Sequence, residues 1–147
     1  MSLQDLFITS KGQPITYKGK VLQMIDRVNL SSGRVGIKVS FLQTNSKWKQ
    51  GIVLQTKGKF EVNGKIVKNK IVLWEHTAPP EIGLFVMSDD AVLIVYNAWQ
   101  TEDGTIDYWH NGAAMKIDQK EQTRIYNCND GYADEDFDDL IFQIEFQ

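Results

Sequence analysis

The C-terminal end of the chain joins its densest group of carboxylates directly to an apolar segment. Six of the nineteen Asp and Glu residues lie between Asp130 and Asp139 with no Lys or Arg among them, so this segment carries −6 and the rest of the chain +3. Repulsion of this size opposes a compact loop unless something neutralises it. Crowded carboxylate oxygens, with no Cys or His among them, suit calcium better than zinc. The composition of the segment therefore predicts a calcium site.

The alternation of the following segment adds a geometric conflict. From Leu140 to Phe146 the even positions are apolar and the odd positions, which begin with Asp139, are mainly polar, as in a strand with one buried face. Continued backwards, the same alternation places Asp134, Asp136 and Asp138 on the core side. Unpaired carboxylates in an apolar layer cost several kcal/mol each. Either the chain kinks between Asp138 and Asp139, or the acids converge on a cation.

An EF-hand is one arrangement that this spacing suggests. Asp134, Asp136 and Asp138 are separated as the first three ligands of that calcium loop are, and Glu145 falls at the position of its last ligand. Asp139, however, occupies the position where an EF-hand turns on Gly, and the two residues after Glu145 cannot form the exiting helix. The match does not extend to the fold, although the ligand spacing keeps its meaning.

The acidic segment has a closer resemblance to a known family. From Asn129 it reads Asn-Asp-Gly-x-x-Asp-x-Asp-Phe-Asp-Asp-Leu-Ile, followed by an alternating strand. This resembles the C-terminal motif of the calcium-dependent fucose- and mannose-binding bacterial lectins, written roughly as E-D-G-T-D-x-D-Y-N-D. Those lectins are small β-sandwiches whose acidic loop holds two calcium ions that ligate sugar hydroxyls. The resemblance implies calcium as cofactor, carbohydrate as ligand, and metal ligands at Asp130, Asp134, Asp136, Asp138, Asp139 and, more weakly, Asn129.

The chain departs from the lectin pattern in three places. One more residue separates Gly131 from Asp134, and Asp138 stands where the lectins have Asn. In the lectins a terminal Gly carboxylate completes the neighbouring subunit's site, whereas this chain ends in Gln147. The sequence therefore leaves open whether the protein forms a homo-oligomer. The alternative function is a structural or protein-interaction β-domain that has no small ligand. In that case the acids form a solvated loop that protects a sheet edge.

Aromatic residues provide a second candidate site. Trp99 and Trp109 flank the Asp103–Gly104 turn, and His110 and Asn111 follow. Aromatic faces stack on sugar rings, while neighbouring polar side chains bind hydroxyls. This pattern predicts ligand binding at Trp99, Trp109, His110 and Asn111. Aromatic residues at strand positions also commonly fill the core, and that alternative stays open.

The rest of the chain predicts an all-β fold. Helical periodicity is nearly absent, and short β-branched and aromatic runs recur between Gly, Asn and Asp turn signals. Asn63-Gly64 predicts a type I′ hairpin, and Asp103-Gly104 predicts a second hairpin. With 147 residues, of which 42% are hydrophobic, the chain suits one core. We expect residues 1–147 to form a single-domain antiparallel β-sandwich, jelly-roll-like, of nine to eleven strands.

Composition also argues against several classes of function. A net charge of −3, with Lys and Arg scattered singly, does not favour nucleic-acid binding. No classical signal peptide and no apolar run of membrane-spanning length are present, so we expect a soluble protein, either cytoplasmic or exported without a leader. Cys128, the only cysteine, excludes an intrachain disulfide and is expected to be buried.

Enzymatic activity is not expected. His76 and His110 each lack a second His or Cys at zinc-ligand spacing, and no nucleophile turn accompanies them. Paired acids can serve a glycosidase, but six acids within ten residues resemble a cation cage more than one acid and one base.

Overall fold

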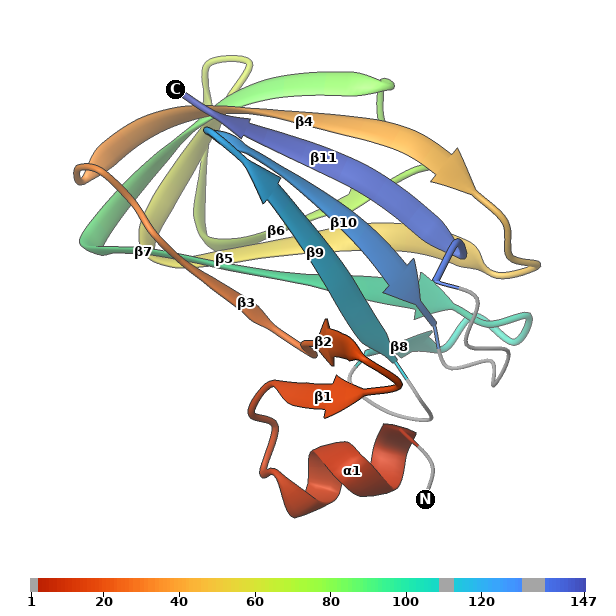
Figure 1. Ribbon diagram of the computed structural model, residues 1–147. Helices are drawn as coiled ribbons and strands as arrows, with labels where there is room; N and C mark the ends of the chain where they lie inside the picture. The colour runs from red at the N-terminus through yellow and green to blue at the C-terminus, as the bar shows by residue number, and fades with distance from the viewer. Residues whose placement is uncertain (1–2, 109–112, 131–136) are drawn as a thin grey trace.

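The computed structural model describes residues 3–108, 113–130 and 137–147, and most of them lie in β-strands. In chain order the elements are α1 (Leu3–Thr9), β1 (Ile15–Tyr17), β2 (Lys20–Leu22), β3 (Asp26–Asn29), β4 (Arg34–Thr44), β5 (Lys49–Val62), β6 (Lys65–Trp74), β7 (Glu81–Gln100), β8 (Ile106–Asp107), β9 (Ala114–Lys120), β10 (Thr123–Asn129) and β11 (Leu140–Phe146). These described strands form antiparallel sheets of two and nine strands. The predicted all-β, sandwich-like fold is confirmed (Figure 1).

The larger sheet is organised around β7. Its strand order is β6-β5-β7-β4-β11-β10-β9, and β3 and β8 also pair with β7. One edge of β7 pairs with β5, whereas the other edge pairs with β4 over residues 81–87 and with β3 over residues 92–95. Between these two stretches Ala91 has φ 56°. The partners of β7 therefore change where its regular extended backbone is interrupted.

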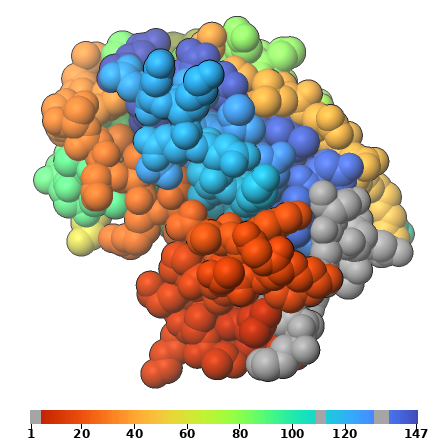
Figure 2. All heavy atoms as spheres, viewed as in Figure 1, coloured from red at the N-terminus to blue at the C-terminus, as the bar shows by residue number. Residues whose placement is uncertain are grey.

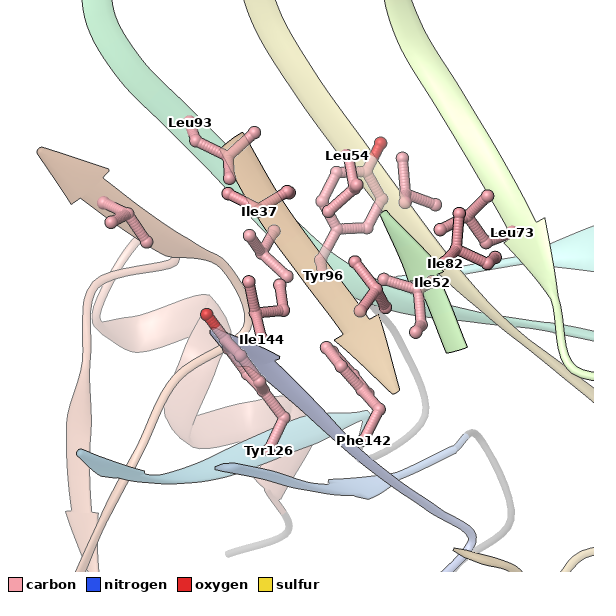
Figure 3. Close-up of a cluster of buried hydrophobic side chains, with 14 of the residues drawn as sticks. Ile37, Ile52, Leu54, Leu73, Ile82, Leu93, Tyr96, Tyr126, Phe142 and Ile144 are labelled. Carbon is pink, nitrogen blue, oxygen red and sulfur yellow. The ribbon is translucent and has the colours of Figure 1, made fainter. Parts of the chain in front are cut away.

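The main core lies inside this curled sheet. Figure 3 shows side chains from β4, β5, β6, β7, β10 and β11 meeting there, with Phe142 and Ile144 from the terminal strand among them. The Tyr126 and Phe142 rings stack at 4.4 Å between centroids. On β11 the even residues Leu140, Phe142 and Ile144 are fully buried. The predicted terminal strand and its apolar face are confirmed.

Both predicted hairpins are present. Asn63 and Gly64 have φ 52° and 78°, which is the left-handed pair that a type I′ turn requires. The Asp103–Gly104 turn joins β7 to β8. β5 and β7 are the longest strands of the described chain. A bulge at Gly58 and the interruption before Ala91 break the side-chain alternation without ending the strand.

A second, smaller core lies at the N-terminal end. Phe7 of α1, Leu22 of β2, Ala114 of β9 and Phe137 pack together and are all buried. Figure 2 shows the N-terminal segment, in red and orange, as a lobe at one end of the molecule. Helical periodicity did not predict α1, because seven residues are too few for a clear period. None of the described helices is long and apolar enough to cross a membrane.

Candidate functional site

The acidic segment follows the end of β10 and meets the loop between β4 and β5. The Asp130 side chain is fully buried, and one of its carboxylate oxygens, Oδ2, accepts two hydrogen bonds from that loop and the start of β5. Ser46 Oγ donates at 2.6 Å and Gln50 Nε2 at 3.0 Å. Both donors are neutral, so they satisfy hydrogen-bonding capacity without cancelling the negative charge of a carboxylate.

Asp138 and Asp139 return to the same place from the start of β11. Asp139 is 2% exposed, and its Oδ2 accepts the backbone N–H of Asp130 at 2.9 Å. Asn45 donates from its backbone to the Asp139 carbonyl at 3.1 Å, and from Nδ2 to Asp138 Oδ2 at 2.9 Å. Residues that are distant in sequence therefore join in one hydrogen-bonded network, in which Asp130, Asp138 and Asp139 each contact the β4–β5 loop.

Asp139 lies on a different side of the chain from the one predicted. Alternation from β11 placed it on the solvent face, whereas its side chain is buried. The chain bends at Asp139 itself, directly before β11 begins, and also at Phe137, whose φ of 57° is left-handed. The predicted kink is present, but it includes this earlier residue. Because side chains alternate only along an extended chain, positions before β11 do not follow its parity.

Burial of its aromatic ring stabilises the unusual backbone of Phe137. The ring is 8% exposed in the second core, against Phe7 and Leu22. The Lys20 ammonium lies 5.7 Å from the ring centroid, within cation–π range. A left-handed aromatic residue costs conformational energy and persists only where its surroundings hold it. The N-terminal lobe thus fixes one end of the acidic segment.

Gln50 is a part of this site that sequence reasoning missed. Its side chain is 2% exposed, and Nε2 donates both to Asp130 and to the Trp48 carbonyl, at 3.2 Å for the latter. These two acceptors fix the orientation of the amide. Its Oε1 is buried, and within the described part of the chain it accepts no hydrogen bond. A buried carbonyl oxygen that accepts no hydrogen bond costs about 1–3 kcal/mol of folding stability, and a bound ligand would offset this cost.

The donor set fits calcium in kind. Asp130, Asp138, Asp139 and Gln50 present oxygen atoms, and Asn129 beside them is fully buried, its backbone carbonyl accepting from Asn97 Nδ2 at 3.2 Å. Among the residues with described positions, no three His, Cys, Asp or Glu side chains form a group that could hold a metal ion. The predicted ligands Asp134 and Asp136 lie outside the described residues.

The predicted aromatic site is only partly described. Trp99 is 1% exposed and stacks on Trp48, which is partly exposed, with 6.5 Å between ring centroids and 14° between planes. Trp48 lines a hollow of about 490 Å³ beside the Asp103–Gly104 turn. Of the aromatic pair, Trp48 is therefore the one with an accessible surface. The predicted ligand residues Trp109, His110 and Asn111 lie outside the described positions.

Carboxylates give the hollow its chemistry. Glu102, Asp103 and Asp107 line it together with Lys47, whose Nζ is 3.8 Å from Glu102. Asp103 accepts hydrogen bonds from the Thr101 hydroxyl at 2.5 Å and the Thr105 N–H at 3.0 Å, and these bonds lower the pKa of Asp103 to about 2. The carboxylate is therefore ionised at neutral pH. An aromatic face beside acceptors suits a ligand with several hydroxyl groups.

The two sites are joined through the backbone of Trp48. Ser46 Oγ, which donates to Asp130, accepts the Trp48 N–H at 3.2 Å. Gln50 Nε2 binds both the Trp48 carbonyl and Asp130. A change at the Asp130 carboxylate therefore reaches Trp48 through one intermediate residue on either side.

Cys128 should be inert in the native protein. It is fully buried, as predicted, and burial followed by the nearby Asp139 carboxylate raises its thiol pKa well above 9. Because the thiolate is the reactive form, a disulfide reagent at pH 8 should label Cys128 only after unfolding. Absorbance of the released thiolate, with and without denaturant, measures this. Rapid stoichiometric labelling of the native protein would contradict it.

Comparison of the chain with protein-family models, curated proteins and solved structures gave no match.

Proposed function

We propose that this chain is a calcium-binding β-sandwich module that holds the ion where the β10–β11 segment meets the β4–β5 loop. One observation carries the proposal. The buried Asp139 carboxylate accepts the backbone N–H of Asp130, and the buried Asp130 carboxylate accepts a hydrogen bond from Gln50, whose own buried Oε1 accepts none in the described chain. A cation among these oxygens offsets the negative charge and provides a partner for the amide oxygen.

The assignment divides the work between two groups of residues. Asp130, Asp138 and Asp139 supply the charge that neutralises the ion, with Asp134 and Asp136 as further ligands expected from the sequence. Gln50 supplies a neutral oxygen from a regular strand, which makes the site less dependent on the loop alone. Ser46 orients Asp130 from outside the coordination shell through its short hydrogen bond.

Carbohydrate is the ligand class that we propose for the module. The partly exposed Trp48 ring and the carboxylates of the adjoining hollow can provide stacking and hydroxyl acceptors. Trp48 is held by Ser46 and Gln50, the two residues that also bind Asp130. Calcium binding then orders the platform, so sugar binding is expected to depend on the ion.

Isothermal titration with calcium tests the metal site. Wild type should bind calcium. Gln50→Met keeps the side chain's length but removes the whole amide, both its oxygen and the Nε2 donor to Asp130 and Trp48, and should weaken binding about tenfold. Gln55→Met, on the same strand, is the matched control and should leave the affinity unchanged. Absence of binding by wild type, or equal affinities for wild type and Gln50→Met, would count against the site.

A second titration, with fucose, mannose and galactose in the presence of calcium, tests the ligand class. Binding should be lost in chelator and in Trp48→Ala, while Trp48→Ala retains its affinity for calcium. Sugar binding that persists in chelator would separate the hollow from the metal site. No binding of any sugar to calcium-loaded wild type would remove the carbohydrate part and leave the metal part standing.

One observation favours the competing function, a structural or interaction domain without a small ligand. Ser46, Gln50 and the Asp130 N–H already give the buried carboxylates hydrogen bonds from neutral groups. In this alternative the segment braces the sheet by itself. It predicts the same thermal stability in calcium and in chelator.

A further inference from the structure

A second feature of the molecule, remote from the acidic segment, concerns its lysines. Residues 57–70 contain five Lys and one Glu in a chain whose net charge is −3. They belong to the end of β5, the Asn63–Gly64 turn and β6. Spaced along the sequence, these lysines look isolated. Strand pairing across the Asn63–Gly64 turn places two of them, Lys59 and Lys68, on paired strands at the same level.

Lys59 and Lys68 are directly opposite each other in the β5–β6 pair. Side chains at directly opposed positions project from the same face of a sheet about 5 Å apart, and like charges there are destabilising. Neither lysine takes part in an ion pair within 4.0 Å among the described residues. On β4, by contrast, Arg34 is 3.9 Å from Glu61 and Lys38 is 3.8 Å from Glu145. Among the described residues, Lys59 and Lys68 are therefore two opposed positive charges with no ion-pair partner within 4.0 Å.

Both lysines line a hollow of about 440 Å³. The hollow lies over the bulge at Gly58, where β5 shifts its register against both β6 and β7. Gly58 has φ 150°, and a Cβ there would lie 2.1 Å from the Met87 carbonyl oxygen, so no other residue fits. Asn69, next to Lys68, also lines the hollow and has a left-handed φ of 64°. Unusual backbone at two lining positions shapes this surface around the lysine pair.

We propose that this hollow binds a tetrahedral oxyanion, a phosphate or sulfate group carried by a small molecule. Two ammonium groups on one face provide point charges for such a group, and the Asn69 amide can add a neutral donor. Occupancy by a dianion converts the lysine repulsion into attraction. Asp89 is the one acid among the lining residues, and its carboxylate opposes the anion. The site does not depend on calcium, so it stands apart from the proposed function.

The test is a titration of the whole chain with inorganic phosphate and then with sulfate, at constant ionic strength and in chelator. Chloride at the same ionic strength is the reference. In wild type, the NMR chemical shifts of the backbone amides at residues 58–59, 68–69 and 88–89 should change with anion concentration and reach a plateau. Lys59→Gln and Lys68→Gln should each raise the dissociation constant about fivefold or more, as expected for one charged contact at a partly solvated site. Asp89→Asn should lower it.

Lys65→Gln is the matched control. It removes the same charge from the same hairpin at a position that does not line the hollow, and should change the dissociation constant less than about twofold. Without anion, Lys68→Gln should be as stable as wild type or more stable, since it removes a like-charge contact. An equal effect of Lys65→Gln and Lys68→Gln, destabilisation by Lys68→Gln without anion, or no saturable shifts in wild type would each overturn the proposal. Saturation by phosphate but not sulfate, or the reverse, would identify which oxyanion the hollow accepts.

Discussion

Calcium at about a hundredfold excess over its dissociation constant should raise the melting temperature of wild type by about 5–10 °C over the value in chelator. A ligand that binds only the native state adds about 2.7 kcal/mol of stability at that excess. For a chain of this length, 1 kcal/mol corresponds to roughly 2–4 °C. Differential scanning calorimetry in calcium and in chelator measures the difference. The gain should follow the calcium concentration rather than the ionic strength.

Asp139→Asn should remove that gain while sparing the apo protein. The substitution preserves the shape of the side chain and keeps an oxygen that can accept the Asp130 N–H, now 2.9 Å from Asp139 Oδ2. It removes one of two charges in a buried pair, since Asp130 and Asp139 are 0% and 2% exposed. In chelator the variant should therefore be at least as stable as wild type, because carboxylate repulsion is relieved. In calcium it should be less stable.

Asp118→Asn is the matched control for the charge change. Asp118 is exposed on β9, with its carboxylate 3.8 Å from Lys116, and the variant should keep the full calcium gain. The informative result is that Asp139→Asn keeps or raises the melting temperature in chelator but lowers it in calcium. If Asp139→Asn lowered the melting temperature equally in calcium and chelator, Asp139 would be a structural hydrogen-bond acceptor and not a metal ligand.

Local patterns predicted the parts of the fold that depend on neighbouring residues. The alternation of β11 predicted its bounds and its buried face, and Asn63-Gly64 predicted a type I′ turn. These succeed because strand parity and turn dihedrals are set within a few residues. Bulges defeat the same reasoning. The bulge at Gly58 interrupts the side-chain alternation of β5. Alternation alone therefore does not show that a single strand continues through the bulge.

Only the acidic half of the candidate site could be predicted from the sequence. The density and spacing of the acids are visible in the sequence. Gln50 and Ser46, in contrast, are 80 and 84 residues away from Asp130 and belong to no metal-ligand motif. Their approach depends on which strands pair. The buried side of Asp139 was also beyond the pattern, because the chain bends at Asp139 and at Phe137 before β11 begins, and the left-handed Phe137 packs in the N-terminal lobe. Long-range packing decides both features.

Asp26→Ala should be the most destabilising single substitution at a polar position, by about 3–5 kcal/mol, the usual range for breaking a buried ion pair. The Asp26 carboxylate is 2% exposed on β3 and accepts from Arg124 Nη1 at 3.1 and 3.0 Å, and from the Tyr126 hydroxyl at 2.7 Å. Both donors belong to β10, whereas β3 pairs with β7, which β4 and β11 separate from β10 in the strand order. Removing the Asp26 carboxylate leaves the Arg124 guanidinium and the Tyr126 hydroxyl without their hydrogen-bond acceptor, in a place where water has little access.

A double-mutant cycle in urea separates the ion pair from simple loss of packing. Arg124→Met removes the cation and keeps an apolar stem, so Asp26→Leu with Arg124→Met should recover most of the stability lost in Asp26→Leu alone. Tyr126→Phe should cost less than Asp26→Ala, because it deletes one donor and leaves the Arg124 pair intact. Additive effects of Asp26→Leu and Arg124→Met would mean that the two side chains do not stabilise each other. The contact between β3 and β10 would then rest on its apolar neighbours alone.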